Sequence, residues 1–128
     1  MAFDSVSRKK LVLEIKGKSK LQCEFKRHLS PRTAGLIMRS LPVEGNAHFL
    51  GNSIVYLETP FESGVERPRK EFKKGDIAFL PTGGTICIFK SKTSTGKSMT
   101  PLGKIISGIE ILAEVKAGDI ISFYEETG

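Results

Sequence analysis

The chain has 128 residues, of which 39% are hydrophobic and 27% are charged, and its formal net charge is +6. This length suits one domain with a substantial core, which we expect to comprise residues 1–128. No apolar run approaches the ~18 residues of a membrane span, which argues against an integral membrane protein. Residues 1–5 lack the charged start and apolar core of a secretory signal, so we expect a cytoplasmic protein that contacts no membrane.

The positive charge is concentrated near the start of the chain. Residues 1–40 hold ten Lys and Arg against three Asp and Glu, whereas residues 41–128 hold ten against eleven. A basic segment of this kind can attract nucleic acid. Between residues 10 and 26, however, the cations alternate with apolar side chains, as they do on the wet face of a β-hairpin. We therefore favour a solvated face and disfavour nucleic acid as a partner.

Two cysteines and two histidines are the residues that would first suggest a metal site. Cys23 and Cys87 each lie inside an apolar run, which predicts two buried, reduced thiols. A Cys–His zinc site needs more ligands at closer spacing than His28 and His48 supply. We expect no metal and no cofactor.

The first half of the chain predicts a hairpin followed by a helix. Apolar residues at period two predict strands at 11–15 and 21–25, with a glycine-containing turn between them. A helix is predicted over residues 30–41, because Ser30 suits the N-cap and Pro31 suits the first helical position. The helix should end before Pro42.

The remaining chain predicts short strands separated by turns. The predicted strands are 43–50, 54–57, 77–80, 85–89, 102–107 and 120–124. Residues 61–74 are predicted to be an exposed excursion with a short strand at 70–72, and residues 91–101 a flexible polar loop. A short helix is predicted at 109–115. These elements favour a mainly β fold, a closed β-barrel of about eight strands with one or two short capping helices.

Part of this pattern resembles a known family. The segment from Leu102 to Val115 is similar to the cyclophilin segment FGKVxxGxxVVxxI, which forms a strand, a glycine hinge and a short helix. The span from Ile54 to Phe123 resembles the small cyclophilin-like proteins of archaea and some thermophilic bacteria, a family of unassigned function. The matching residues are Val55-Tyr56-Leu57, Thr59-Pro60, Gly75-Asp76, Phe79, Pro81, Gly83, Cys87-Ile88-Phe89, Leu102-Gly103 and Gly108. Before residue 54 only the order of elements agrees.

The resemblance implies a peptide-gripping surface without its catalytic donor. Cyclophilins twist X-Pro amides with an Arg donor beside an apolar pocket, and Gln, Trp and His side chains hold the peptide. The nearest match to the Arg-bearing motif is Asn46–Gly51, which has no arginine, and the chain has no Trp. Candidate groove residues are His48, Tyr56, Phe79, Cys87, Phe89 and Met99, and the remaining candidate donors are Arg67 and Arg69.

Several candidates also have a plainer explanation. Tyr56, Phe79 and Phe89 are of a type that dominates hydrophobic cores. His48 could be a base, or a hydrogen-bonded residue of a strand wall. The Gly-Lys-Ser at residues 96–98 lacks the earlier glycine and the following helix of a phosphate-binding loop.

Two functions stay open at this point. The first is a binding module for a peptide or a small apolar ligand, with weak or absent isomerase activity. The second is an atypical prolyl isomerase that uses Arg67 or Arg69 as its donor. A nucleic-acid partner of the basic face is a weaker third reading, and the pattern predicts no particular oligomeric state.

Overall fold

The computed structural model describes residues 8–125, so the start of the chain, from which the lack of a leader was predicted, lies outside that range. The strands are β1 (Arg8–Ile15), β2 (Ser19–Lys26), β3 (Val43–Asn46), β4 (His48–Leu50), β5 (Ile54–Glu58), β6 (Arg69–Phe72), β7 (Asp76–Leu80), β8 (Thr85–Phe89), β9 (Thr93–Ser107) and β10 (Ile120–Glu125). The helices are η1 (Arg27–Leu29), α2 (Pro31–Arg39) and η2 (Ile109–Glu114). Across these described residues, no helix has the length and apolar character needed to cross a membrane.

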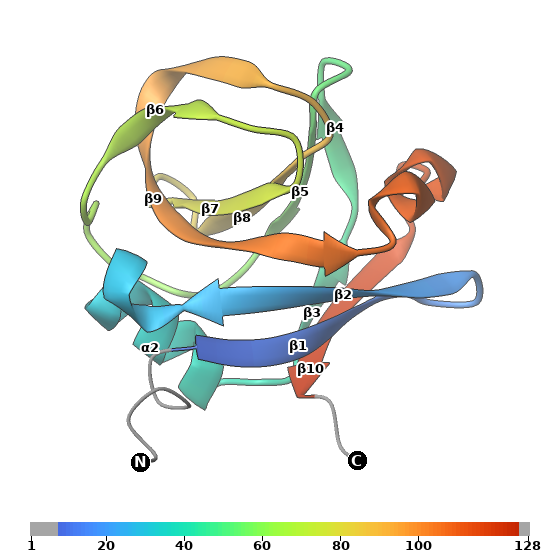
Figure 1. Cartoon of the computed structure of the whole chain (residues 1–128), viewed down its shortest axis with the longest axis horizontal. Helices are drawn as coiled ribbons and strands as arrows, with labels where there is room; N and C mark the ends of the chain where they lie inside the picture. Colours follow the sequence, from blue (N-terminus) through green and yellow to red (C-terminus); the bar gives the residue numbers. More distant parts are fainter. Residues whose placement is uncertain (1–7, 126–128) are drawn as a thin grey trace.

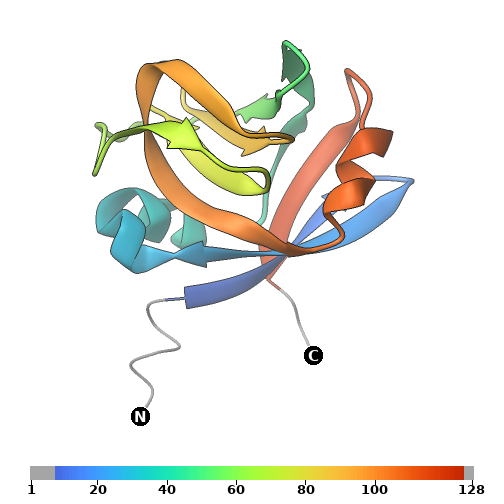
Figure 2. The same ribbon diagram turned by 45° about the horizontal axis from the view of Figure 1, so that its top comes forward.

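The strands form one strongly rolled antiparallel sheet (Figures 1 and 2). The pairing order is β3-β10-β1-β2-β9-β7-β8-β5-β4, and β6 pairs with β9 beside this path. The two end strands, β3 and β4, follow one another in the chain and are separated only by Ala47.

The expected closed barrel of about eight strands is therefore corrected to a ten-stranded sheet that strand pairing does not close. Residues 43–50 were predicted to be one strand, but they change partner at Ala47. The Ala47 amide donates to the Asp119 carbonyl oxygen at 2.7 Å, while β4 pairs with β5. Within residues 8–125, β3 and β4 thus each keep one unpaired edge.

The main core fills the inside of the rolled sheet, and it confirms the predicted hairpin and helix. Phe25 of β2 and Phe123 of β10 meet at its centre, with ring centroids 5.7 Å apart. The other large, fully buried side chains here are Leu11, Leu13, Ile15, Ile37, Leu57, Ile77, Phe79, Ile86 and Ile88. Both cysteines are buried and unbonded to one another, as predicted.

A second, smaller cluster lies on the other face of β5, β7 and β8. Its buried members are Ile54, Phe72, Ala78, Cys87, Phe89 and Met99, with Tyr56 and Leu80 packed at its edge. Burial on both faces explains why these three strands read as near-continuous apolar runs rather than as alternations. Phe72 of β6 stacks on Phe89 at 4.5 Å between ring centroids.

The first half of β9, which covers this second cluster, was predicted wrongly. Residues 91–101 were expected to be a flexible loop, but β9 begins at Thr93 and its first half pairs with β6. This part of β9 curls over the cluster together with β6 (Figure 2). Met99 is its one large apolar side chain, and it is 3% exposed.

The second half of β9 lies between β2 and β7. Gly103 is opposite Phe25 on one side and Ile77 on the other. A Cβ atom at this position would overlap the carbonyl oxygen of Glu24, so the strands can approach this closely only with hydrogen there. The following glycine turn and helix, Gly108 and η2, match the prediction.

Ser30 occupies the N-cap position of α2, as predicted, but its side chain makes no capping hydrogen bond. The Ser30 hydroxyl donates instead to the Pro101 carbonyl oxygen at 2.7 Å. The capping side chain is Glu66 of the 61–74 excursion, whose carboxylate accepts the amides of Arg32 at 3.1 Å and Thr33 at 3.0 Å. The excursion is thus docked on the helix.

These contacts set the charge state of Glu66. Burial alone would raise the pKa of its carboxyl, but hydrogen bonds from Thr33 and Arg32 outweigh burial and lower the pKa below 4.5. A carboxylate near a helix N-terminus is also favoured by the helix dipole. The stabilisation is therefore present above the unfolded-state pKa and is lost as the pH falls through the folded-state pKa.

Gly103→Ala should destabilise the protein by about 2–3 kcal/mol, because the added methyl group forces β2 and β9 apart. Urea unfolding followed by circular dichroism measures the change. Gly96→Ala is the matched control on the same strand, since a Cβ there meets no atom within 4 Å. Equal stability of the two variants would contradict the close approach at Gly103.

Glu66→Gln should lower the free energy of unfolding at neutral pH by about 1 kcal/mol, in the range of a lost helix cap. The difference from the native protein should shrink as the pH falls below the folded-state pKa of Glu66, because the native carboxylate is then protonated as well. Urea unfolding at several pH values measures this. Glu62→Gln, an exposed neighbour on the excursion, should match the native protein throughout. A Glu66→Gln deficit that is constant with pH would refute the cap.

Candidate functional site

The second cluster opens to solvent at one end, and this opening is the main candidate site. We call it the apolar groove. It has a volume of about 580 Å³ and lies between the β4–β5 turn, the end of β7 and the first half of β9. Its lining residues are Leu50, Gly51, Ser53, Ile54, Leu80, Thr93, Ser94, Thr95, Gly96, Lys97 and Met99. This volume falls in the usual range for sites that bind small molecules.

The floor of the groove is apolar. Ile54, Leu80 and Met99 belong both to the groove lining and to the second cluster beneath it. Leu50 extends the apolar surface toward solvent and is 59% exposed. A ligand would therefore meet a continuous hydrocarbon surface.

The rim of the groove is polar, but most of its groups are already engaged. The Thr93 hydroxyl donates to the Ser91 carbonyl oxygen, and the Ser94 hydroxyl donates to Glu71. The Thr95 hydroxyl donates to the Lys97 carbonyl oxygen at 2.7 Å. Within residues 8–125 the Lys97 ammonium group has no ion pair. The groove thus offers apolar contact and one positive charge.

The predicted groove residues are only partly brought together. Met99 lines the groove, and Tyr56, Cys87 and Phe89 lie in the cluster beneath it. Phe79 does not belong to this group. It alternates with Ala78 and Leu80 along β7, so its side chain lies in the main core.

His48 lies beside this cluster on β4. Its ring stacks on that of Tyr56, with centroids 5.3 Å apart and an interplanar angle of 27°. The His48 side chain is exposed, and in the part of the chain described here it makes no side-chain hydrogen bond. Among these residues it therefore lacks the hydrogen bond expected of a strand-wall residue, and no hydrogen-bond partner positions it as a base.

Burial makes the two thiols unreactive. It raises the pKa of Cys87 to about 12, and burial together with the nearby Glu24 raises the pKa of Cys23 to about 12. Both thiols are therefore protonated at neutral pH and are poor nucleophiles. Among residues 8–125, no three His, Cys, Asp or Glu side chains gather in a way that could hold a metal ion.

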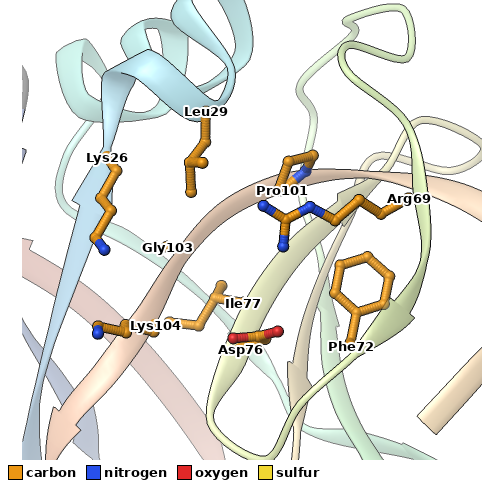
Figure 3. Close-up of a pocket in the computed structure, with 9 residues that line it drawn as sticks. All are labelled: Lys26, Leu29, Arg69, Phe72, Asp76, Ile77, Pro101, Gly103 and Lys104. Carbon is orange, nitrogen blue, oxygen red and sulfur yellow. The ribbon is translucent and has the colours of Figure 1, made fainter.

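A second hollow, which we call the basic pocket, lies where η1, β6, β7 and β9 meet (Figure 3). Its volume is about 130 Å³. Its lining residues are Lys26, Leu29, Arg69, Phe72, Asp76, Ile77, Pro101, Gly103 and Lys104. It contains Arg69, one of the two predicted donors.

The two predicted donors thus have different surroundings. The Arg69 guanidinium lies near Pro101, with the Phe72 ring close by (Figure 3). Arg67 is exposed on the excursion, has a left-handed φ of 46°, and lines neither the apolar groove nor the basic pocket. Neither arginine lines the apolar groove.

Sequence reasoning missed two parts of these sites. It missed the groove wall at residues 93–97, where Thr93, Thr95 and Lys97 recur at period two. That alternation was the one available sign of a strand. It was weak, because no apolar side chain occurs in the segment before Met99. It also missed Lys26 and Lys104 of the basic pocket, which only the β2–β9 register brings together.

Comparison with known proteins agrees with this fold. The family model described as cyclophilin-like matches residues 9–124. The solution structure of the hypothetical protein AF2241 from Archaeoglobus fulgidus is similar, with a TM-score of 0.77 and 21% identity over 94% of this chain and 96% of that one. No curated protein matches the sequence.

A second solved structure, that of McbB in complex with tryptophan, has a TM-score of 0.77 and 13% identity. The match covers 92% of this chain but 45% of McbB, so this chain spans less than half of that protein. At such identities the two structures show the fold alone. The family match extends over nearly all of residues 8–125, and the chain therefore belongs to the cyclophilin-like family.

Proposed function

We propose that this protein is a non-catalytic binding module whose apolar groove takes a small, largely apolar ligand or an apolar side chain of a peptide. The observation that carries this proposal is the groove floor, where Ile54, Leu80 and Met99 form one apolar surface under a polar rim. Pockets of this size and character are the usual sites for small ligands. The complex of McbB with tryptophan, in a protein of the same fold, makes tryptophan a reasonable first probe.

The expected affinity is modest. Burial of about 150 Å² of apolar ligand surface contributes roughly 4 kcal/mol at about 25 cal/mol per Å². Because association also costs translational and rotational freedom, we expect a dissociation constant of about 1 mM or weaker. Titration by NMR is therefore the appropriate method.

The surroundings of the groove support the expectation that it does not catalyse prolyl isomerisation. Stabilising a twisted prolyl amide requires a positioned donor, and removing such a donor typically costs about 3 kcal/mol or more of transition-state stabilisation. Arg67 and Arg69 do not line the groove. Among the described lining residues, Lys97 is the one charged side chain, and it lies at the exposed rim.

Leu50→Asn should weaken tryptophan binding about fivefold, because it removes roughly 1 kcal/mol of apolar contact from the groove. The measurement is a titration of the ¹⁵N-labelled protein with tryptophan. In the native protein, the amides that shift should be those of residues 50–54, 80 and 93–99.

Ile106→Asn is the matched control, since Ile106 is 44% exposed on β9 and lies outside the groove. It should leave the tryptophan affinity unchanged. Saturable shifts confined to other parts of the chain, or equal losses in the two variants, would refute the proposal.

A second candidate function, an atypical prolyl isomerase, is favoured by one observation. The Arg69 guanidinium lies beside an aromatic ring and an apolar wall in the basic pocket (Figure 3). The volume of about 130 Å³ opposes it, because ligand sites usually exceed about 300 Å³ and a prolyl peptide must fit with its flanking groups. We therefore rank it below binding.

For this alternative, we expect the protein to leave cis–trans exchange in an Ala-Phe-Pro-Phe peptide at its uncatalysed rate, which is slow at 25 °C. Exchange spectroscopy by NMR measures the rate directly. Faster exchange that is abolished by Arg69→Ala but kept by Lys70→Ala, its neighbour on β6, would establish the isomerase instead.

A further inference from the structure

Ligand binding in the apolar groove assigns no role to the basic pocket. Three cations reach this pocket from three separate strands: Lys26 from the end of β2, Arg69 from the start of β6 and Lys104 from β9 (Figure 3). The β2–β9 pairing places Lys104 opposite Glu24, two residues before Lys26. The fold, rather than a run of basic sequence, therefore brings these charges together.

Within the part of the chain that the structure describes, none of the three cations forms an ion pair, although Glu24 and Asp76 lie opposite Lys104 on the two neighbouring strands. The ion pairs there use Lys9, Lys16, Lys18 and Arg32 instead. Asp76 is the one carboxylate among the lining residues, and its Oδ2 accepts the Lys73 amide at 2.9 Å. The lining therefore has three formal positive charges and one formal negative charge, and Glu24 adds a second carboxylate beside Lys104 just outside the lining. Cations held close together repel one another, and a bound anion would relieve this repulsion.

The apolar walls of the pocket strengthen the attraction between its cations and an anion. Leu29, Ile77 and Pro101 present apolar surface, and such walls lower the local dielectric constant and focus the field of the cations. The volume of about 130 Å³ gives room for a small ion but not for a large organic ligand.

We propose that the basic pocket binds a small phosphate group. Arginine offers a planar fork of donors that matches phosphate oxygens, and lysine adds a point charge. Three cations suit a phosphate, which carries about 1.5 to 2 negative charges at neutral pH, better than they suit a singly charged carboxylate. The phosphate is either the free ion or the head group of a small monoester.

The test is a titration of the ¹⁵N-labelled full-length protein with inorganic phosphate at constant ionic strength. Saturable shifts should appear at the amides of residues 26, 77, 103 and 104. Arg69→Gln and Lys104→Gln should each weaken binding at least about fivefold, as expected for loss of a charge-assisted hydrogen bond. Asp76→Asn should strengthen binding, because it removes the one negative charge among the lining residues and keeps an oxygen for the Lys73 amide.

Lys70→Gln is the matched control, since Lys70 is an exposed neighbour of Arg69 on β6 that does not line the pocket. It should leave the affinity unchanged. Arg69, Lys70 and Lys104 are all exposed, so thermal unfolding should show folded variants. Absence of saturable shifts, an equal loss in Lys70→Gln, or acetate binding as tightly as phosphate would each overturn the proposal.

Parallel titrations with phenyl phosphate identify the source of the group. Binding as tight as or tighter than that of inorganic phosphate supports a monoester as the ligand. Tight binding of inorganic phosphate alone supports the free ion. Both results support the phosphate site.

Discussion

The rest of the structure depends on the close approach of two backbones at Gly103. A side chain at this position would overlap the Glu24 carbonyl oxygen, so β2 and β9 pair closely here only because hydrogen replaces a methyl group. On its other edge, the same stretch of β9 pairs with β7. Gly103 thus joins the N-terminal hairpin to the strands that carry both hydrophobic clusters. The first half of β9 is left free to curl over β7 and β8 and to pair with β6.

This arrangement makes one strand contribute to two sites. The first half of β9 supplies a wall of the apolar groove, and the second half supplies Pro101, Gly103 and Lys104 to the basic pocket. The second cluster lies between them, because Met99 faces the groove and Phe72 lines the basic pocket. The two sites have different chemistry, since one is apolar with a single rim cation and the other collects three cations around one carboxylate.

Local features of the sequence were read correctly, whereas features set by distant contacts were not. The β1–β2 hairpin follows from period-two alternation, and the start of α2 follows from Pro31. Ser30 is at the N-cap position, as predicted, but its hydroxyl bonds Pro101 instead of capping, and Glu66, 33 residues after Thr33, accepts the Thr33 amide. Residues 93–99 form a strand because they pair with β6. Their mostly polar sequence lacks the apolar alternation that would predict a strand. The single strand expected at 43–50 changes partner at Ala47, which no local pattern marks.

Because the second cluster lies between the apolar groove and the basic pocket, we expect the two sites to bind their ligands independently, and a sequential titration measures this. A ¹⁵N-labelled sample is saturated with tryptophan and then titrated with inorganic phosphate at constant ionic strength. We expect two disjoint sets of shifted amides, the first around residues 50–54 and 93–97 and the second around residues 26, 77 and 103–104. The phosphate affinity should be the same with and without tryptophan. Competition between the two ligands, or one shared set of shifted amides, would contradict the account.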